Sequence, residues 1–159
     1  MYNFENKWFD KLALELYKFN AKTPLRSLRN ACDLESIKKD LKKRIDTSKY
    51  SFISIDETNP NDHKIFIFSC YAVKGDKCYI TLMFKSVDYP LNKYVFQQNF
   101  LMWDKLRKMN YKKLYSNNGR AVDEDKYLNF LRRYYNIEIN EKFREPTEFI
   151  FNLENMLTR

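Results

Sequence analysis

The sequence predicts an α+β fold in which a three- to four-stranded antiparallel sheet is flanked by N-terminal and C-terminal helices. Two observations predict it: apolar residues recur with helical spacing toward both ends of the chain, and runs rich in Ile, Phe, Tyr and Val fill its middle. The 159 residues contain no repeat, no flexible linker and no long charged run. We therefore expect a single α+β domain over residues 1–159.

Two amphipathic helices are predicted before the sheet. The first follows Asn3 as its cap and has an apolar stripe with a four-residue repeat. That stripe consists of Phe4, Trp8, Leu12 and Leu16. A short helix then begins at Thr23-Pro24, and a longer helix starts again at Cys32-Asp33. The longer helix has a second apolar stripe of Leu34, Ile37, Leu41 and Ile45.

Three antiparallel strands are predicted in the middle of the chain. They are Tyr50–Glu57, Lys64–Val73 and Cys78–Lys85, and turn-forming residues at 59–62 and 75–76 separate them. The middle run is apolar at successive positions, which indicates burial on both faces of the sheet. Helices are therefore expected to cover at least one face.

The last third of the chain is predicted to be mainly helical. A helix begins after Asn92 and continues to Leu106, although Tyr94–Gln97 also fits a fourth strand. A turn at 117–119 precedes a helix capped by Asp123, and Pro146 starts a last helix.

Several kinds of chemistry are excluded by residues that the chain lacks. Its three cysteines are Cys32, Cys70 and Cys78, with no CxxC spacing and only one histidine, so neither a zinc site nor a disulfide framework is expected. Gly75 and Gly119 are its only glycines, which excludes a glycine-rich phosphate loop. We expect no cofactor, no metal and no membrane-spanning segment, and a soluble protein in the cytoplasm of a bacterial host.

The charge balance predicts an anionic partner. Twenty-nine Lys and Arg residues against 21 Asp and Glu residues give a net charge of +8, which favours nucleic acid, an acidic protein surface or a guide-RNA complex. The amino-acid bias of an AT-rich genome is an alternative source of the same charge.

Two basic segments are candidate binding surfaces. The later one is interleaved with tyrosines, which suits phosphates and unstacked bases, and a nearby Arg and Tyr suit a protein interface. The predicted partner-binding residues are Lys105, Lys108, Lys112, Lys113, Arg132 and Tyr134. The secondary basic patch consists of Lys38, Lys39, Lys42 and Lys43. Alternatives are a cationic helix end with core tyrosines for the first surface and a solvated helix face for the second.

One group of acids offers enzymatic chemistry. Asp56 and Glu57 end one predicted strand and Asp62-His63-Lys64 opens the next, so the carboxylates could meet and hold Mg²⁺ as in a metal-dependent nuclease. An exposed turn requires the same polar residues, and the spacing is short. The helices around 23–45 also permit a helix-turn-helix, as in a basic nucleic-acid-binding regulator of phage or plasmid origin.

As a whole, the chain resembles a phage-borne anti-CRISPR protein of the type II-A group. The resemblance rests on the opening residues from Met1 to Trp8, the Phe- and Tyr-rich hairpin Ile65–Phe84, and the overall size and composition. It implies a non-enzymatic inhibitor with no catalytic residues and no small-molecule substrate. It also implies that the inhibitor binds a type II CRISPR effector nuclease or its guide-RNA complex, by capture of the HNH nuclease domain, and blocks DNA cleavage.

Overall fold

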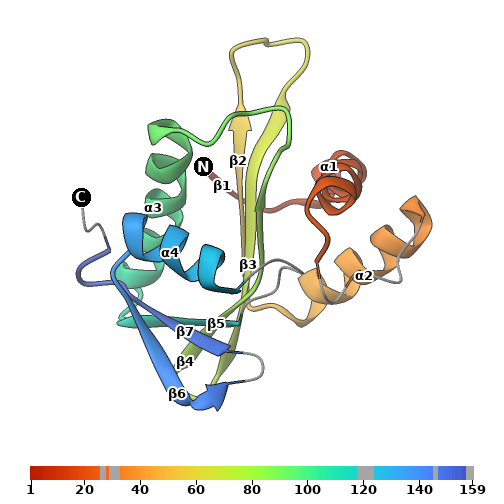
Figure 1. The fold of residues 1–159 in the computed structure, drawn as a ribbon. Coiled ribbons are helices and arrows are strands. Elements are labelled where there is room, and N and C mark those ends of the chain that lie inside the picture. The colour runs from red at the N-terminus through yellow and green to blue at the C-terminus, as the bar shows by residue number, and fades with distance from the viewer. Residues whose placement is uncertain (26–27, 29–32, 118–123, 145–146, 157–159) are drawn as a thin grey trace.

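A seven-stranded sheet with helices on both faces forms the centre of the protein (Figure 1). The computed structural model describes residues 1–25, 28, 33–117, 124–144 and 147–156. The strands are β1 (Tyr2–Asn3), β2 (Tyr50–Asp56), β3 (Lys64–Lys74), β4 (Lys77–Lys85), β5 (Lys113–Asn117), β6 (Ile137–Arg144) and β7 (Thr147–Asn152). The helices are η1 (Asn6–Trp8), α1 (Phe9–Lys22), α2 (Leu34–Thr47), α3 (Lys93–Lys108) and α4 (Glu124–Tyr134).

The strand order is β1-β2-β3-β4-β5-β7-β6, and every neighbouring pair is antiparallel except β4 and β5. The predicted sheet of three to four antiparallel strands was therefore wrong in strand number and in its antiparallel pattern. The chain passes from β4 through α3 to β5, and a crossover of this length is what a parallel neighbour requires. The sheet is thus mixed.

Side-chain caps fix the starts of two helices. The Asp33 carboxylate accepts a hydrogen bond from Ser36 N at 2.8 Å, and the Asn92 side chain accepts one from Val95 N at 3.3 Å. Both caps satisfy a backbone donor that the first helical turn leaves unpaired. The structure confirms a helix start at each of these predicted positions. No helix among the described residues is both long and apolar enough to cross a bilayer.

The first predicted helix begins later than its apolar stripe suggested. Tyr2 and Asn3 form an edge strand that pairs with Ile53 and Phe52, and α1 begins only at Phe9. The stripe is real, because Leu12 and Leu16 are fully buried, but Phe4 reaches the same core from extended backbone. Four-residue spacing cannot distinguish a residue on the helix from one on the extended chain before it, because both can bring a side chain to the same face.

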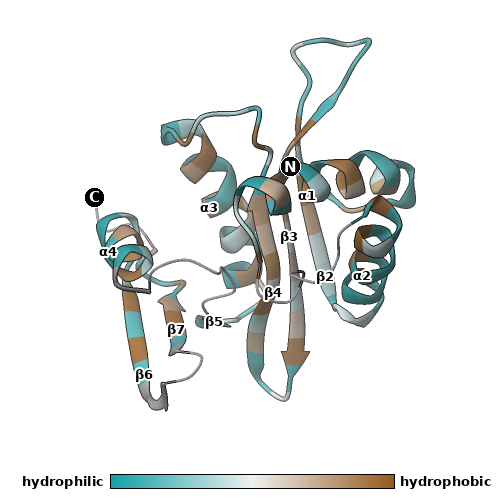
Figure 2. Ribbon diagram, turned by 45° about the vertical axis from the view of Figure 1, so that its right-hand side comes forward, coloured by the Kyte–Doolittle hydropathy of each residue, from teal (hydrophilic) through white to brown (hydrophobic). Residues whose placement is uncertain are grey.

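Two hydrophobic cores lie on opposite faces of the sheet. α1 and α2 cover one face, where Leu16, Ile37 and Phe68 meet, and α3 and α4 cover the other (Figure 1). Trp103 and Tyr71 are at most 1% exposed in the second core. Figure 2 shows hydrophobic residues concentrated on the central strands and hydrophilic ones along α2. Burial on both faces confirms the expectation for the middle strand, β3.

The hairpin of β3 and β4 follows the sequence closely. Gly75 has a φ of 63°, a backbone conformation that glycine adopts without strain, and it lies in the predicted turn. Cys70 and Cys78 are buried free thiols, as expected. They do not face each other, because Cys70 pairs with Leu82 across the ladder and Cys78 with Val73.

The last third of the chain differs most from its prediction. The residues expected to form a helix after Pro146 form β7, and residues 113–117, where no strand was predicted, form β5. The alternative strand at Tyr94–Gln97 was also wrong, because these residues belong to α3. In β7, Phe149 and Phe151 face the core at strand spacing, which a helical pattern through Phe149 and Leu153 had concealed. The predicted features at Cys32, 118–119, Asp123 and Pro146 lie outside the described residues.

Candidate functional site

The seam between β4 and β5 is where the sheet opens. The two strands pair only at Cys78–Leu114 and Tyr79–Tyr115, and β4 then continues to Lys85 with no β5 partner recorded. Cys78 lies in the paired part of β4, just before the two strands diverge. Its burial raises the pKa of its thiol to about 12, so the thiol stays protonated at neutral pH. The sheet thus parts at one edge of β4, and two cavities border this opening.

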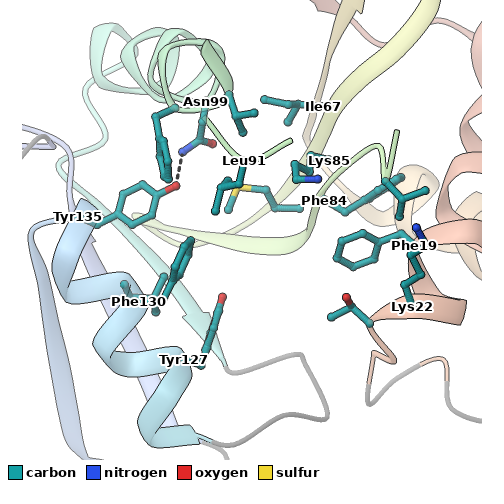
Figure 3. A pocket seen from close by; sticks show the side chains of 16 residues that line it. Phe19, Lys22, Ile67, Phe84, Lys85, Leu91, Asn99, Tyr127, Phe130 and Tyr135 are labelled. Carbon is teal, nitrogen blue, oxygen red and sulfur yellow. Dashed lines mark hydrogen bonds between the residues drawn. The ribbon is translucent and has the colours of Figure 1, made fainter. Parts of the chain in front are cut away.

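The first, which we call the α3–α4 cavity, has a volume of about 290 Å³. Its wall includes Met83 and Lys85 of β4, Val95 and Asn99 of α3, and Tyr127 and Leu131 of α4 (Figure 3). The wall is mostly apolar with a few convergent polar groups, which is the usual composition of a small-molecule site.

One polar atom on this wall has no protein partner. Asn99 is 3% exposed, and its Nδ2 donates a hydrogen bond to Tyr135 Oη at 3.2 Å. Its Oδ1 is the one buried side-chain atom for which the described part of the chain supplies no hydrogen bond. Figure 3 shows that Asn99 bonds to Tyr135 on one side while its oxygen turns toward the cavity. A buried acceptor without a donor is costly, so a ligand N–H placed here would gain a strong hydrogen bond.

The second, the β4–β5 cavity, has a volume of about 450 Å³. Its wall includes Arg44 of α2, Thr81 and Met83 of β4, Tyr115 of β5, Tyr127 of α4 and Glu148 of β7. Arg44 is bound to Asp40 at 2.6 Å and to the Thr81 carbonyl oxygen at 2.7 Å, so its charge is largely compensated. Glu148 is half-buried and accepts a hydrogen bond from Asn140 Nδ2 at 3.0 Å. The cavity therefore presents an oriented carboxylate.

The two cavities share Met83 and Tyr127. The Tyr127 ring stacks on Phe130 at 6.5 Å and meets Phe149 edge-on at 5.8 Å, contacts that hold its orientation on α4. Figure 3 shows its hydroxyl directed toward the α3–α4 cavity. Met83 and Tyr127 thus border both cavities.

The residues predicted for partner binding do not form one surface with these cavities. Lys105 donates a hydrogen bond to Asn3 Oδ1 and lies 5.1 Å from the Phe52 ring, so it joins α3 to the sheet. Lys108 pairs with Asp104 at 3.0 Å, an acid just before the basic run. Lys113 pairs with Glu138 on β6, and Lys112 is exposed. The role of these four lysines in partner binding stays a prediction.

The other predicted binding residues are also apart from the site. Arg132 is exposed on α4, while Tyr134 stacks on Phe96 at 4.5 Å and belongs to the second core. In the secondary patch, Lys38 pairs with Asp10 and Lys42 with Asp46. The remaining members of that patch are Lys39 and Lys43, which are exposed on α2. Their role in binding stays a prediction.

The acids proposed for a nuclease have other partners. Asp56 accepts hydrogen bonds from Thr58 and from Tyr89 Oη, which lower the pKa of its carboxyl to about 2. Asp62 pairs with Lys11 across a surface loop. Within the described ranges, no three His, Cys, Asp or Glu side chains gather to hold a metal ion.

Sequence reasoning missed the residues that form the two cavities. Tyr127 fits the apolar stripe of a helix, but spacing alone cannot distinguish a core tyrosine from one beside a cavity. Asn99 could have been found from the sequence, because an amide on the apolar side of a helix is rarely buried without a polar partner. Glu148 had no signal, since its segment was expected to be helical.

Comparison with known proteins identifies the fold. An acetyltransferase of the GNAT family from Staphylococcus aureus Mu50 has a TM-score of 0.61 and 10% identity, over 96% of this chain and 97% of that chain. The ribosomal-protein-S18-alanine N-acetyltransferase from Escherichia coli has a TM-score of 0.60 and 12% identity, over 96% and 92%. PaiA N-acetyltransferase from Thermoplasma acidophilum, in complex with coenzyme A, has a TM-score of 0.56 and 6% identity, over 92% and 93%. No family model matches the sequence, and no curated protein matches it.

The chain therefore has the fold of GNAT-family acetyltransferases, and this corrects the sequence-based view of its function. The resemblance to anti-CRISPR proteins was wrong, and with it the non-enzymatic inhibitor, the CRISPR nuclease partner and the absence of a small-molecule substrate. Size, Lys- and Tyr-rich composition and one hairpin are shared by unrelated folds, so they could not carry that assignment. No observation favours the nucleic-acid-binding regulator or the nuclease.

Proposed function

We propose that this protein is an N-acetyltransferase that moves an acetyl group from a thioester donor in the α3–α4 cavity to an amine in the β4–β5 cavity. The observation that carries the proposal is that the two cavities share Met83 and Tyr127 at the opening of the sheet. Transfer between two molecules needs their reacting atoms about 3–3.5 Å apart, and two adjoining cavities can supply that approach. The fold shared with acetyltransferases supports the same reaction.

The α3–α4 cavity suits the arm of such a donor. Coenzyme A carries its thiol on a flexible pantetheine arm with two amide groups, and it is bound in the PaiA structure. The unpartnered Asn99 Oδ1 offers an acceptor to one amide N–H, and Val95 and Leu131 offer apolar contact to the methylene groups. The bound thioester would supply an activated acetyl group.

The β4–β5 cavity suits an amine. The Glu148 carboxylate, oriented by Asn140, would bind the ammonium form and accept a proton at Oε1 or Oε2 as the amine becomes nucleophilic. The Tyr127 hydroxyl lies where the cavities meet, and it would donate the proton that the leaving sulfur takes up. The new bond joins nitrogen to the acetyl carbon, and the bond between that carbon and sulfur breaks. The nitrogen then loses a second proton, which restores the Tyr127 hydroxyl.

Direct transfer is favoured over an acyl-cysteine route. Burial raises the pKa of both Cys70 and Cys78, so neither thiol ionises readily, and a nucleophilic cysteine needs a thiolate. The two side chains are also fully buried. Among the described residues, no exposed cysteine could hold the acetyl group between donor and amine.

The test is amine-dependent thiol release from acetyl-coenzyme A and from S-acetylpantetheine by the purified full chain. The amines are a peptide α-amine, a lysine side chain and an amino sugar, and mass spectrometry identifies the acetylated product. We expect at least one amine to accelerate thiol release and to carry the acetyl group. Release that equals the protein-free rate with every amine would contradict the proposal.

A further inference from the structure

The α3–α4 cavity has room for an arm but not for a nucleotide. Its 290 Å³ lies at the lower end of the ~300–1,000 Å³ that small-molecule sites span. Leu91 and Val95 both line it, so the cavity borders the loop 86–92 and the first turn of α3 (Figure 3). The diphosphate and adenosine of coenzyme A would therefore lie outside the cavity, over this loop.

A helix N-terminus binds phosphate through unpaired backbone N–H groups. Here the protein itself uses one such group of α3, together with two N–H groups of the preceding loop. Ser86 N donates to Phe66 O at 2.9 Å, Asp88 N to Ser86 Oγ at 3.2 Å, and Val95 N to the Asn92 side chain at 3.3 Å. Residue 90 is proline, which has no N–H. Neither glycine of the chain lies in the loop, so its backbone has no position that permits unusually close approach.

The charges that touch this loop disfavour an anion. Glu15 accepts a hydrogen bond from Ser86 Oγ at 2.7 Å, and Asp56 accepts one from Tyr89 Oη at 2.6 Å. Asp88 belongs to the loop itself and pairs with Lys18 at 3.8 Å.

The ammonium group of Lys85 turns inward at the same place. It donates to the carbonyl oxygens of Ser86 and Tyr89, at 3.1 and 2.6 Å. Lys64 lines the same surface as Asp56 and Asp88. Three carboxylates and two ammonium groups, those of Lys18 and Lys85, contact the loop itself. Both ammonium groups are engaged within the protein.

From these contacts, and resting on the proposed function, we infer that the donor is an acyl-pantetheine recognised by its arm alone, with its diphosphate and nucleotide contributing nothing to affinity. The recognition elements are the apolar wall and Asn99 Oδ1. Any thioester on a pantetheine arm qualifies, whatever group lies beyond the end of the arm.

The experiment is calorimetric titration of the full chain with pantetheine, 4′-phosphopantetheine and coenzyme A at ~0.15 M salt, where long-range charge effects are screened. We expect the three dissociation constants to agree within about threefold, because phosphates that do not contact the protein add nothing to the affinity. Coenzyme A that binds about thirtyfold or more tighter than pantetheine would overturn the inference while leaving the proposed function intact. Failure of all three to bind would instead overturn the proposed function.

Four variants test the inference further. Asn99→Ala should weaken all three ligands equally, by about tenfold, and exposed Gln97→Ala on the same helix should weaken none. Lys22→Gln and Lys93→Gln remove exposed cations near the cavity and should leave the three affinities unchanged. A loss confined to coenzyme A in either lysine variant would show a phosphate contact and contradict the inference.

Discussion

The two halves of the sheet are held together in different ways. β2, β3 and β4 pair antiparallel along most of their lengths, and β3 is buried on both faces. β5, β7 and β6 form a second antiparallel group, and two residue pairs at the start of β4 join its ladder to that of the first group. The first half supplies a rigid frame, while the weak seam leaves room for the two cavities. Binding sites generally lie at such less cooperative places, because an opening costs less there.

Side chains on the α3 face compensate for the short seam. Trp103 Nε1 donates a hydrogen bond to Tyr71 Oη of β3 at 3.1 Å, and the Trp103 ring lies 5.0 Å from that of Phe151 on β7. One buried indole therefore contacts both halves of the sheet. Residues that hold the two halves of the sheet together are thus distinct from residues that line the cavities between them.

Trp103→Ala should have the largest effect, because it removes the contact between the halves and leaves a cavity. We expect a loss of about 3–5 kcal/mol in the free energy of unfolding, measured by urea denaturation. Trp8→Ala, at a half-buried position beside α1, should cost clearly less. Equal losses would show that Trp103 has no special role in joining the two halves.

Tyr127→Phe should lower the transfer rate by about 100-fold while the protein remains folded, because it removes one hydroxyl proton donor where the cavities meet. The measurement is kcat for amine-dependent thiol release. Tyr115→Phe is the matched control, since Tyr115 lines only the β4–β5 cavity. Full activity in Tyr127→Phe would mean that another group donates the proton, whereas Tyr115→Phe should keep full activity in either case.

Glu148→Gln should raise KM for the amine by about tenfold, since a neutral amide replaces the charged acceptor of a hydrogen bond from the ammonium group. It should also lower kcat by about 100-fold, because the amide cannot accept the proton that the amine loses. KM for the thioester should not change. Glu138→Gln, an exposed acid paired with Lys113 outside the cavity, should alter none of these constants. A rise in the thioester KM alone would place Glu148 on the donor side.

Tyr89→Phe should have the smallest effect, and that effect should disappear in acid. The Tyr89 hydroxyl is the main reason that the pKa of Asp56 falls to about 2, so Asp56 contributes stability above its ordinary pKa and loses it as the pH falls toward 2. The variant should be less stable than the wild type at pH 7, and the two urea midpoints should converge near pH 2. A difference that stays constant across that range would mean that Asp56 ionisation is not involved.

The sequence predicted the half of the sheet whose pairings are local. β3 and β4 are joined by a tight turn at Gly75, and alternation of apolar residues is enough to define such a hairpin. The other half depends on long-range pairing: β5 has a basic, polar sequence that reads as a connector until β4 and β7 flank it. β7 was predicted as a helix and no strand was predicted at β6, because short strands carry few periods of their pattern.

The candidate site was less accessible to sequence reasoning than the fold. Met83 and Tyr127 gain their importance only because β4 and β5 separate after Tyr79, and no local pattern encodes that divergence. Basic residues attracted attention instead, yet Lys105 and Lys108 serve contacts within the protein. Charge is visible in a sequence, whereas the orientation of Asn99 toward a cavity is a property of the folded chain.

The most direct test of the central claim is to block the junction of the two cavities. Met83→Trp places a large ring where the cavities meet, while Met109→Trp makes the same change at an exposed residue that follows α3. We predict that amine-dependent thiol release from S-acetylpantetheine is lost in Met83→Trp and retained in Met109→Trp, with both proteins folded by circular dichroism. Undiminished transfer by folded Met83→Trp would contradict the claim that the acetyl group passes between the two cavities.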